Sequence, residues 1–385
     1  MPTRSRNRPG FALAVSLAAI VIIGAIITGI FFASTQEYRM SRNSAMQARA
    51  LTSAEYGMNS ILRTGQWNPD WNTGAVGHLA DTVYTPNDGG LDTVRVTKLS
   101  DGMFMLTSTG RVGPPTGAQA RHRLGALVTL AIPQLSMLGA LTTRGKFKIG
   151  GNSELSGVDT PVDDWDCPPP GAALPGLAMP DVTQIVTSGC GGSSLTCVTG
   201  SPKVTQTPLA AKDSTYFNYG PSLDWDKLTA MAPLSHTYAP GANLNGLGAT
   251  VSGGACKTAD GNNWGEPLRD TPALSPCWSY FPIIYAKGDL KITGGEGQGI
   301  LLVAGDLIVS GNAKFYGPVI VRGTLTSQGT GGHFNGGVMA ANVDLDLNTL
   351  IGDAVVSYSS CALSRALAGA ATPTFLPNRS WTELF

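Results

Sequence analysis

Apolar and polar positions divide the chain into a long uncharged segment near the N-terminus and a remainder of short alternating segments. No residue between Phe11 and Ala33 carries a charge, and Ser16 and Thr28 are its only hydroxyl-bearing residues. As a helix that rises about 1.5 Å per residue, this segment would span roughly 34 Å, enough to cross the hydrocarbon core of a bilayer. Three arginines precede it: Arg4, Arg6 and Arg8. The positive-inside rule therefore predicts a cytoplasmic leader over residues 1–10 and an exported remainder.

The helical pattern continues past the apolar segment. Residues 34–64 contain no proline, and Gly57 is their only glycine. Five apolar residues recur there at helical spacing on one face: Leu51, Ala54, Met58, Ile61 and Leu62. Gly65 and Pro69 are typical helix-ending residues. The sequence predicts one helix of about 55 residues, roughly 80 Å long, whose second half packs against a sheet.

Three segments after the helix alternate between apolar and polar residues. They are residues 93–97, 103–112 and 118–132. The runs Ser100-Asp-Gly and Gly113-Pro-Pro-Thr-Gly between them fit hairpin turns. The pattern predicts a small antiparallel meander against the helix. Residues 66–90 are expected to form a loop, in which Trp67 and Trp71 cap the core.

Near-repeats characterise the C-terminal half. Arg144-Gly-Lys-Phe-Lys-Ile resembles Lys287-Gly-Asp-Leu-Lys-Ile, and Gly305-Asp-Leu-Ile-Val follows the second copy with a period of about 18 residues. Short strands at a fixed period, punctuated by glycine, are typical of a solenoid. The sequence predicts a right-handed parallel β-solenoid built from residues 136–157 and 281–362. Through its period and its Gly-Asp-Leu recurrences, this region is similar to bactofilin-like and adhesin-like β-solenoids.

Residues 158–280 interrupt the solenoid pattern. They are rich in proline, poor in periodic strands and contain five of the six cysteines, so we expect a loop insertion that disulfides hold together. A short helix is expected at Ser222–Ala232, and residues 363–385 are expected to form a C-terminal tail. Six cysteines in an exported region indicate up to three disulfides among many possible pairings. Proximity in the sequence gives Cys190–Cys197, Cys256–Cys277 and, from the remaining two, Cys167–Cys361.

Composition narrows the classes of function. The formal net charge is +0, and 14% of the residues are charged. No basic run interleaved with aromatic residues follows Arg8, so nucleic-acid binding is not predicted. Glycine (49) and proline (25) are abundant while 42% of the residues are hydrophobic, which is typical of a folded, turn-rich protein.

The leader and its border resemble a type IV prepilin signal, and more closely the N-terminal region of PilX-type minor pilins. The residues that carry this resemblance are Arg8-Pro-Gly-Phe-Ala-Leu, a basic leader that ends in glycine before a spanning helix. The resemblance implies that a prepilin peptidase cleaves between Gly10 and Phe11 and that the new N-terminus is methylated. It also implies contacts with other pilins and with the pilus assembly machinery. Major pilins carry glutamate five residues after the cleavage site, where this chain has Val15, and this departure favours a low-copy or tip-located component.

The resemblance and the charge pattern place the protein in the inner membrane as a single-pass protein. Its N-terminus would be cytoplasmic and its C-terminal part periplasmic, or on the pilus at the cell surface after assembly. A cleaved secretory signal is the first rival, but its apolar region would be shorter, about 7–15 residues. An ordinary single-pass signal anchor remains the second alternative.

Candidate chemistry is sparse. Gly294-Gly-Glu-Gly-Gln-Gly lacks the Gly-Lys-Ser/Thr ending of a phosphate-binding loop and is expected to form a solenoid corner. A cluster of aspartates could in principle ligate calcium, but a solvated acidic turn is favoured (Asp159, Asp163, Asp164 and Asp166). The histidines are scattered and do not predict a zinc site (His78, His122, His236 and His333).

Carboxylates on the solenoid keep an enzymatic alternative open, because β-solenoids also occur in polysaccharide lyases and hydrolases. Five aspartates are candidates for such a site: Asp289, Asp306, Asp344, Asp346 and Asp353. The Gly-Asp repeats more simply place aspartate at coil corners, where its side chain binds turn amides. We therefore predict no catalytic residues, no cofactor and no metal.

The sequence as a whole predicts a membrane-anchored α+β protein: a long N-terminal helix on a small antiparallel sheet, followed by a β-solenoid with a disulfide-braced insertion. The expected function is that of a non-enzymatic minor-pilin-like component of a type IV pilus or related assembly, acting in assembly, priming or surface attachment. The alternative is a signal-anchored exported β-helix protein that acts on polysaccharide or adheres to it.

Overall fold

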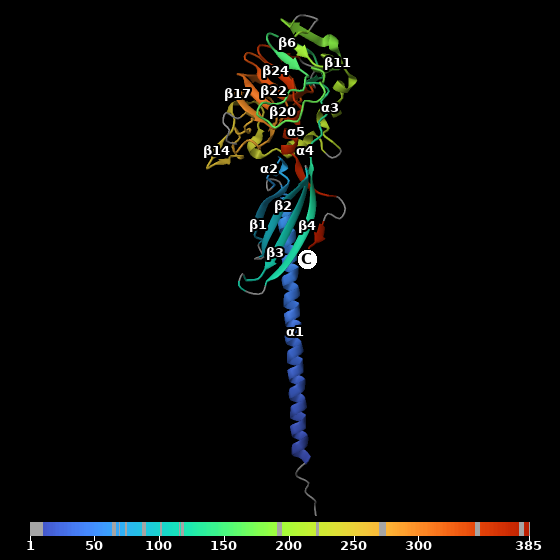
Figure 1. Ribbon diagram of the computed structural model, residues 1–385, viewed down its shortest axis with the longest axis vertical. Helices are drawn as coiled ribbons and strands as arrows, with labels where there is room; N and C mark the ends of the chain where they lie inside the picture. The colour runs from blue at the N-terminus through green and yellow to red at the C-terminus, as the bar shows by residue number, and fades with distance from the viewer. Residues whose placement is uncertain are drawn as a thin grey trace, which may run out of the picture.

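A computed structural model describes most of the chain. The described residues are 11–63, 67–68, 70–73, 75–86, 90–100, 102–114, 116, 119–190, 195–220, 223–268, 275–342, 347–376 and 381–384. The molecule is elongated, with a long helix at one end, a β-sheet around the last part of that helix and a larger head at the other end (Figure 1). We call the last part of this helix, together with the sheet around it, the stem.

Helix α1 (Phe11–Ile61) is one uninterrupted helix, as its proline-free sequence predicts. Its last turns bury four apolar side chains completely: Ala50, Ala54, Met58 and Ile61. Leu51 and Leu62 are partly buried against the same core, so the predicted helical face is the one that packs. The residues expected to end the helix, Gly65 and Pro69, lie outside the described residues.

The stem sheet is antiparallel, in the order β1-β2-β3-β4-β25, with β26 also paired to β4. Its strands are β1 (Gly77–Tyr84), β2 (Leu91–Ser100), β3 (Met103–Val112), β4 (Ala120–Ala131), β25 (Thr372–Phe375) and β26 (Trp381–Glu383). Strands β2, β3 and β4 are the three that the sequence predicted. Strand β1 lies within residues 66–90, which were expected to form a loop. It was missed because a bulge between His78 and Ala80 breaks its alternation.

The C-terminus belongs to the stem. Thr372 in β25 pairs with Ala131 at the end of β4, so the chain leaves and re-enters the stem sheet at neighbouring positions. The expectation that residues 363–385 form a C-terminal tail was therefore wrong. This segment contains the last part of α5 (Ser360–Gly369) and then two strands of the stem sheet. Its short strands do not show in the sequence pattern because none of their residues is fully buried.

Two tryptophans close the stem core where the helix ends. Trp67 is 8% exposed and lies edge-on to Trp71 and Phe104, with ring centroids 5.0 and 5.1 Å away. The expectation that these tryptophans cap the core agrees with this packing.

The head is a parallel sheet of 18 strands curled into stacked coils, with a continuous apolar core inside. Nine strands come from the first part of the head: β5 (Leu141–Thr143), β6 (Phe147–Gly150), β7 (Glu154–Ser156), β8 (Leu177–Met179), β9 (Ile185–Ser188), β10 (Val198–Thr199), β11 (Val204–Gln206), β12 (Thr237–Tyr238) and β13 (Ala242–Leu247). The other nine are β16 (Ile283–Ala286), β17 (Leu290–Gln298), β18 (Ile300–Val303), β19 (Leu307–Ser310), β20 (Ala313–Val321), β21 (Leu325–Ser327), β22 (Gly332–Ala340), β23 (Asn348–Leu350) and β24 (Val355–Tyr358).

The predicted period of the solenoid is visible in the strand register. Leu290, Leu307 and Leu325 pair in successive coils, and all three side chains are buried. Inward-facing leucines thus stack on one another at the spacing of the Gly-Asp-Leu repeats, as expected for a solenoid core.

The chain enters the stack of coils in the middle. Strands β5, β6 and β7 pair with β22, β23 and β24 on one side and with β8, β9 and β10 on the other. The chain then crosses to the opposite end of the stack, where β12 and β13 pair with β16 and β17.

Residues 158–280 are therefore not a loop insertion, and this corrects the sequence-based division. They contribute strands β8–β13 to both ends of the same solenoid. Their period is hidden because long loops separate the coils: Phe147 pairs with Ile185, and Ala242 pairs with Leu290. Segment 248–256 adds a separate hairpin, β14 (Val251–Ser252) with β15 (Ala255–Cys256).

The loops between the coils form short helices and turns. They are α3 (Asp213–Phe217) and α4 (Trp225–Ala230), with 3₁₀ turns η1 (Val182–Gln184), η3 (Pro208–Ala211) and η4 (Leu234–His236). Of these, α3 and α4 lie against one wall of the solenoid. Tyr216, Trp225 and Leu228 pack with Ile300 and Ile320 in a second apolar cluster. Helix α4 lies within the predicted range, whose first residue, Ser222, is not described.

A polar joint links stem and head. Asn72, in the short helix α2 (Asp70–Thr73), donates hydrogen bonds from Nδ2 to the carbonyl oxygens of Ala368, Gly369 and Ala371, at 2.9, 3.3 and 3.2 Å. Its Oδ1 accepts a hydrogen bond from Nε1 of Trp67 at 2.8 Å. The stem thus caps the C-terminal end of α5, whose carbonyls have no partners within the helix.

Candidate functional site

Most of α1 has no partner within the described part of the chain. From Leu13 to Arg49 the helix side chains are exposed apart from Thr35, Gln36 and Met46, which are half-buried. The exposed side chains of the apolar segment include twelve large ones: Leu13, Val15, Leu17, Ile20, Val21, Ile22, Ile23, Ile26, Ile27, Ile30, Phe31 and Phe32. An apolar surface of this size on a monomer marks a contact with other proteins or with a membrane.

The hydroxyl groups in this segment are satisfied within the helix itself. Ser16 Oγ donates to the carbonyl oxygen of Leu13 at 2.9 Å, and Thr28 Oγ1 donates to that of Gly24 at 2.8 Å. Such local pairing is what a helix needs in hydrocarbon, where water cannot compensate polar groups. By length and apolar composition, α1 is the one helix of the described chain that could cross a membrane.

The residues that carry the prepilin resemblance meet the structure only in part. Gly10 and the three leader arginines lie outside the described residues, and Phe11 is the first residue of α1. Cleavage between Gly10 and Phe11 therefore stays a prediction. Val15 is 52% exposed on the free part of α1.

The contact between α1 and the sheet contains a buried carboxyl group that the sequence analysis missed. Asp92 in β2 is fully buried, and its Oδ1 lies 2.7 Å from Oγ of Ser108. The same Oγ lies 2.7 Å from the carbonyl oxygen of Ala54 in α1. A hydroxyl has one proton to donate, so both contacts are satisfied when Asp92 is protonated and donates to Ser108, which then donates to Ala54. Burial raises the pKa of Asp92 to about 6.

The solenoid aspartates serve the backbone. Asp289 Oδ1 accepts a hydrogen bond from the amide of Asp306 at 2.9 Å, and Asp306 Oδ1 accepts one from the amide of Thr324 at 2.7 Å. Asp353 accepts one from Nδ2 of Asn152 at 3.0 Å. These carboxylates bridge successive coils at their corners, as the alternative to catalysis predicted. Asp344 and Asp346 lie outside the described residues.

The acidic turn is not assembled into a metal site within the described residues, where no group of three or more metal-binding side chains comes together. Asp159 instead accepts hydrogen bonds from the amide and hydroxyl of Ser360, at 2.8 and 2.7 Å, and from the amide of Gly171 at 2.6 Å. Although burial acts to raise it, these bonds hold the pKa of Asp159 below its usual value. Asp164 occupies a turn with φ of 63°, a conformation that aspartate tolerates.

The glycine-rich run Gly294–Gly299 lies in and just after β17, at a corner of the solenoid. A side chain on Gly295 would lie 2.5 Å from the backbone of Leu247 in the adjacent coil. Gln298, fully buried, donates from Nε2 to the carbonyl oxygens of Trp278 and Tyr280, both at 2.9 Å. The run therefore serves close packing between coils.

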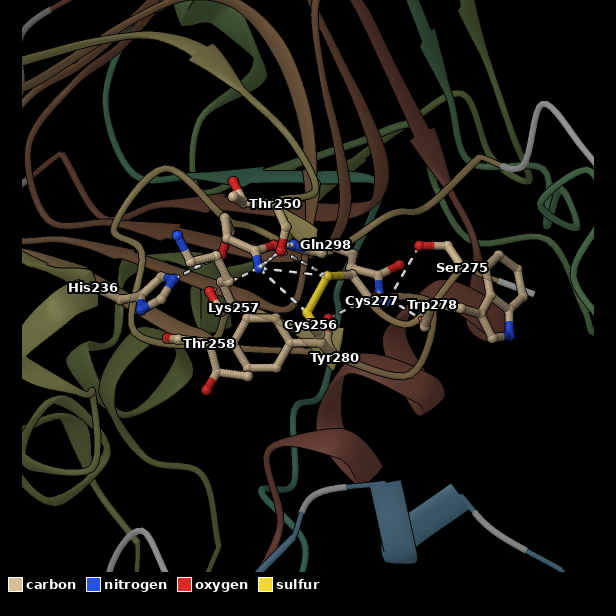
Figure 2. Close-up of a disulfide and its surroundings, with 12 residues drawn as sticks. His236, Thr250, Cys256, Lys257, Thr258, Ser275, Cys277, Trp278, Tyr280 and Gln298 are labelled. Carbon is tan, nitrogen blue, oxygen red and sulfur yellow. Dashed lines mark hydrogen bonds between the residues drawn. A yellow bond between two sulfur atoms is a disulfide. The ribbon is translucent and has the colours of Figure 1, made fainter. Parts of the chain in front are cut away.

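All six cysteines are paired, and the pairs are those that proximity suggested: Cys167–Cys361, Cys190–Cys197 and Cys256–Cys277. Figure 2 shows the last of these beside the labelled residues Thr250, Tyr280 and Gln298. Asn263 fixes the loop around this disulfide, because its Nδ2 donates to the carbonyl oxygens of Lys257 at 2.9 Å and Thr250 at 3.2 Å.

The histidines do not converge. His236, labelled in Figure 2, is buried; its Nε2 lies 2.7 Å from the carbonyl oxygen of Asn263, and its Nδ1 lies 2.9 Å from Oγ of Ser235. Burial lowers the pKa of His236, so it is a neutral structural residue. His78 and His122 lie beside carboxylates of the stem, Asp81 and Glu383, each at 3.4 Å.

The arrangement of the described residues thus offers surfaces for contact and no converging set of catalytic groups. The surfaces are the free part of α1, the outer face of the stem sheet and the head. Sequence reasoning found the first from its apolar run and missed the joint at Asn72, because α2 is too short to show a period.

Comparisons with known proteins add little to this picture. No protein-family model matches the chain, and no characterised protein matches it in sequence. Among solved structures, that of the competence-associated pilin ComZ from Thermus thermophilus is similar, with 13% sequence identity, coverage of 88% of this chain and 97% of that chain, and a TM-score of 0.26. At this TM-score the similarity supports no inference about function. The function is therefore argued from the geometry of the chain itself.

Proposed function

We propose that the protein is a pilin-like component of a type IV pilus or a related assembly, acting in assembly, priming or surface attachment. One observation carries the proposal: a single helix is free and apolar over its first half and packs on its own sheet over its second half. The free half needs an apolar environment, which the inner membrane would supply before assembly and the helices of other pilins after it.

The continuity of α1 distinguishes this proposal from an ordinary signal anchor. An anchor that only tethers a folded domain needs no rigid connection to it. Here the helix continues from Ala33 to Ile61 without a break, so a force or a rotation on its free half is transmitted to the stem core. Such rigidity suits a subunit that is extracted from a membrane and packed into a filament.

The placement of the protein in the assembly is the finer part of the proposal. With Val15 in place of the glutamate of major pilins, the subunit would lack the carboxylate that pairs with a neighbour's N-terminal amine. The head is also much larger than the stem (Figure 1). A low-copy position, and in particular the tip, would accommodate this head without clashes between neighbouring copies.

Processing of the N-terminus tests the proposal. The protein is purified from its native host, and its N-terminus is determined by sequencing and intact mass. We expect a mature chain that starts at Phe11 with a methylated amine. A chain that retains Met1, or that is cut near Ala33, would contradict the pilin-like function. A variant with Gly10→Val should accumulate unprocessed, whereas the neighbouring control Pro9→Ala should be cleaved.

We also propose that the protein acts without chemistry of its own. The hydrogen bonds that Oδ1 of Asp289 and Oδ1 of Asp306 accept from backbone amides support this, since they give both carboxylates a structural role between coils. The test incubates the detergent-solubilised full chain with acidic and neutral polysaccharides and measures depolymerisation. We expect none; robust activity that Asp289→Asn or Asp306→Asn abolishes would overturn this part of the proposal.

A further inference from the structure

The outer face of the stem sheet, turned away from α1, carries a cluster of arginines. Arg111 in β3 pairs directly with Arg121 in β4. Arg123 lies two residues further along β4, opposite Thr109. Arg95 lies on β2, opposite Thr107. Directly opposed residues of an antiparallel pair share a face, and alternate residues along a strand do so too, so all four guanidinium groups belong to one surface.

This cluster is only partly neutralised. Asp81 in β1 binds Arg95 through two hydrogen bonds, from Nε to Oδ1 at 2.9 Å and from Nη2 to Oδ2 at 3.2 Å. That contact holds the pKa of Asp81 below its usual value. Glu383 lies beside His122, which points from the other face of β4. Within the described residues, Arg111, Arg121 and Arg123 have no carboxylate partner.

The direct opposition of Arg111 and Arg121 works against folding. Like charges in directly opposed positions of a sheet repel each other and destabilise the pair. Nothing in the packing of the sheet requires arginine there, since no other helix or strand of the described residues covers this face. A pair that weakens the sheet and has no structural use indicates that an anion offsets the repulsion when it is bound.

A depression of about 170 Å³ lies within the cluster. Four strands line it with three guanidinium groups, three threonine hydroxyls and one carboxylate: Asp81, Thr93, Arg95, Thr107, Thr109, Arg111 and Arg123. The Nε atom of Arg111 is buried there and has no hydrogen-bond partner among the described residues. A volume equal to that of about five or six water molecules suits one tetrahedral oxyanion group and excludes a large ligand.

We propose that this depression binds a phosphate or sulfate ester group. Guanidinium groups bind such oxyanions through paired, charge-assisted hydrogen bonds, which Arg111 and Arg123 would supply from adjacent strands. The hydroxyls of the lining threonines would supply further donors. Arg95 also lines the depression and is held by Asp81. The site lies on the stem and is independent of the head.

The position of the site along α1 indicates where the ester group comes from. Gly110, next to Arg111, lies against Ala50 of α1. If the bilayer ends near Ala33, as proposed above, the site is roughly 25 Å beyond the hydrocarbon core. Headgroups extend only about 5–8 Å beyond that core. We therefore expect a soluble or polymer-borne ester and not a phospholipid headgroup.

Thermal unfolding of the full chain in detergent micelles tests the site. Inorganic phosphate, and sulfate in parallel, are added and compared with sodium chloride at equal ionic strength. For the wild type we expect Tm to rise by about 2–4 °C once phosphate exceeds its Kd about a hundred-fold, and not to rise with chloride. Calorimetric titration with phosphate gives binding directly.

Two variants and one control separate binding from general charge effects. In Arg111→Gln and Arg123→Gln we expect the phosphate-dependent rise to disappear, because both residues line the depression. In Arg111→Gln, Tm without phosphate should stay equal or increase, because the repulsion with Arg121 is gone. Lys291→Gln, an exposed substitution on the head with the same charge change, should respond to phosphate as the wild type does. A phosphate response that survives both arginine substitutions, or one that chloride matches, would overturn the proposal.

A last comparison distinguishes the sources of the group. The wild type and Arg123→Gln are placed in nanodiscs of phosphatidylglycerol or phosphatidylcholine. We expect Tm to be independent of the lipid. A rise in phosphatidylglycerol that Arg123→Gln removes would support the site and assign its phosphate to the membrane. These results do not depend on N-terminal processing, so they fail or succeed separately from the pilin-like function.

Discussion

At the scale of single residues, the packing of α1 on the stem sheet depends on a few polar positions. Asp92 lies fully buried between β2 and the helix, with one oxygen near Ser108 and the other without a hydrogen-bond partner in the described chain. A charge there would be costly because burial removes its hydration. In the sequence, Asp92 is only one polar residue beside a predicted strand. The register between β2 and β3 shows on which face of the sheet it lies.

The stability of the stem should therefore depend on the ionisation of Asp92. Its pKa in the folded protein is raised to about 6, so the protonated form is favoured by folding. The contribution is complete below the unfolded value near 4 and is lost as pH rises through about 6. Asp92→Asn should be more stable than the wild type by up to about 3 kcal/mol at pH 8.

Urea denaturation of both proteins between pH 4 and 8, followed by tryptophan fluorescence, measures this difference. Towards pH 4 the two free energies of unfolding should approach each other, because Asp92 is then protonated in the folded state and about half protonated in the unfolded state. Other carboxylates titrate equally in both proteins and cancel. Parallel curves across the whole range would show that Asp92 does not titrate in this way.

Gly57 provides the space for Asp92. A side chain on Gly57 would overlap Oδ2 of Asp92 and lie 3.0 Å from Cγ2 of Val94. Gly57→Ala gains about 1 kcal/mol of helix propensity, but overpacking should outweigh it and leave a net loss of about 1–2 kcal/mol. Gly24→Ala is the matched control, since nothing lies within 4 Å of its position.

Combining Gly57→Ala with Asp92→Ala checks the cause of that loss. The two residues are in contact, so their effects should not add. We expect the double variant to be more stable than the sum of the two single losses, as measured by urea denaturation. Simple additivity would place the strain of Gly57→Ala elsewhere.

At the scale of elements, the sequence predicts the helices and strands whose apolar residues recur at a regular spacing. The apolar run and the face through Ala54 and Met58 predict α1, because their helical spacing is a local property that can be read without the tertiary structure. The coils from Leu290 to Leu325 are predicted because they follow one another directly. Coils that are separated by long loops, such as those of Phe147 and Ile185, show no regular spacing in the sequence, so their pairing becomes visible only in the folded structure.

The disulfides should differ in their contribution to stability. Cys167–Cys361 closes a separation of 194 residues, whereas Cys190–Cys197 closes one of 7. The chain-entropy model gives about 5 kcal/mol for the first and about 2 kcal/mol for the second. The double variant Cys167→Ser/Cys361→Ser should therefore lose more stability than Cys190→Ser/Cys197→Ser.

Denaturant unfolding under oxidising conditions compares the two double variants. Mass mapping without reduction should first verify that the remaining pairs are intact in each. The long-range pair also lies beside the packed rings of Trp165 and Trp278, which join the first coil loop to α5. Equal losses in the two variants would mean that local packing, and not loop closure, determines the effect.

At the scale of the whole molecule, the head is inserted into the stem sheet. The chain leaves the sheet at Ala131 and returns at Thr372, and these two residues are paired. This connection does not follow from the sequence, because the returning strands are short and the N-terminal half alone accounts for a complete predicted meander. The head is consequently attached at two adjacent strands, which by themselves would allow it to swing.

Asn72 is the residue that should fix the orientation of the head. Its Nδ2 binds three carbonyl oxygens around the end of α5, and its Oδ1 holds the indole of Trp67. Asn72→Ala removes these hydrogen bonds from buried groups, at a cost of about 1–3 kcal/mol. We expect the loss to appear mainly as freedom at the joint, because the stem and the head keep separate cores.

Electron–electron distance measurements between spin labels at Ser100 on the stem and Lys291 on the head test this expectation. Both positions are exposed, and all native cysteines are paired. The distance distribution should be narrow in the wild type and in the control Asn59→Ala, whose side chain bonds only within α1, and broad in Asn72→Ala. An equally narrow distribution in Asn72→Ala would mean that the two strands alone hold the head. A tip component that must present its head at a fixed angle to the helix would need the joint, so the same measurement bears on how α1 and the head act together.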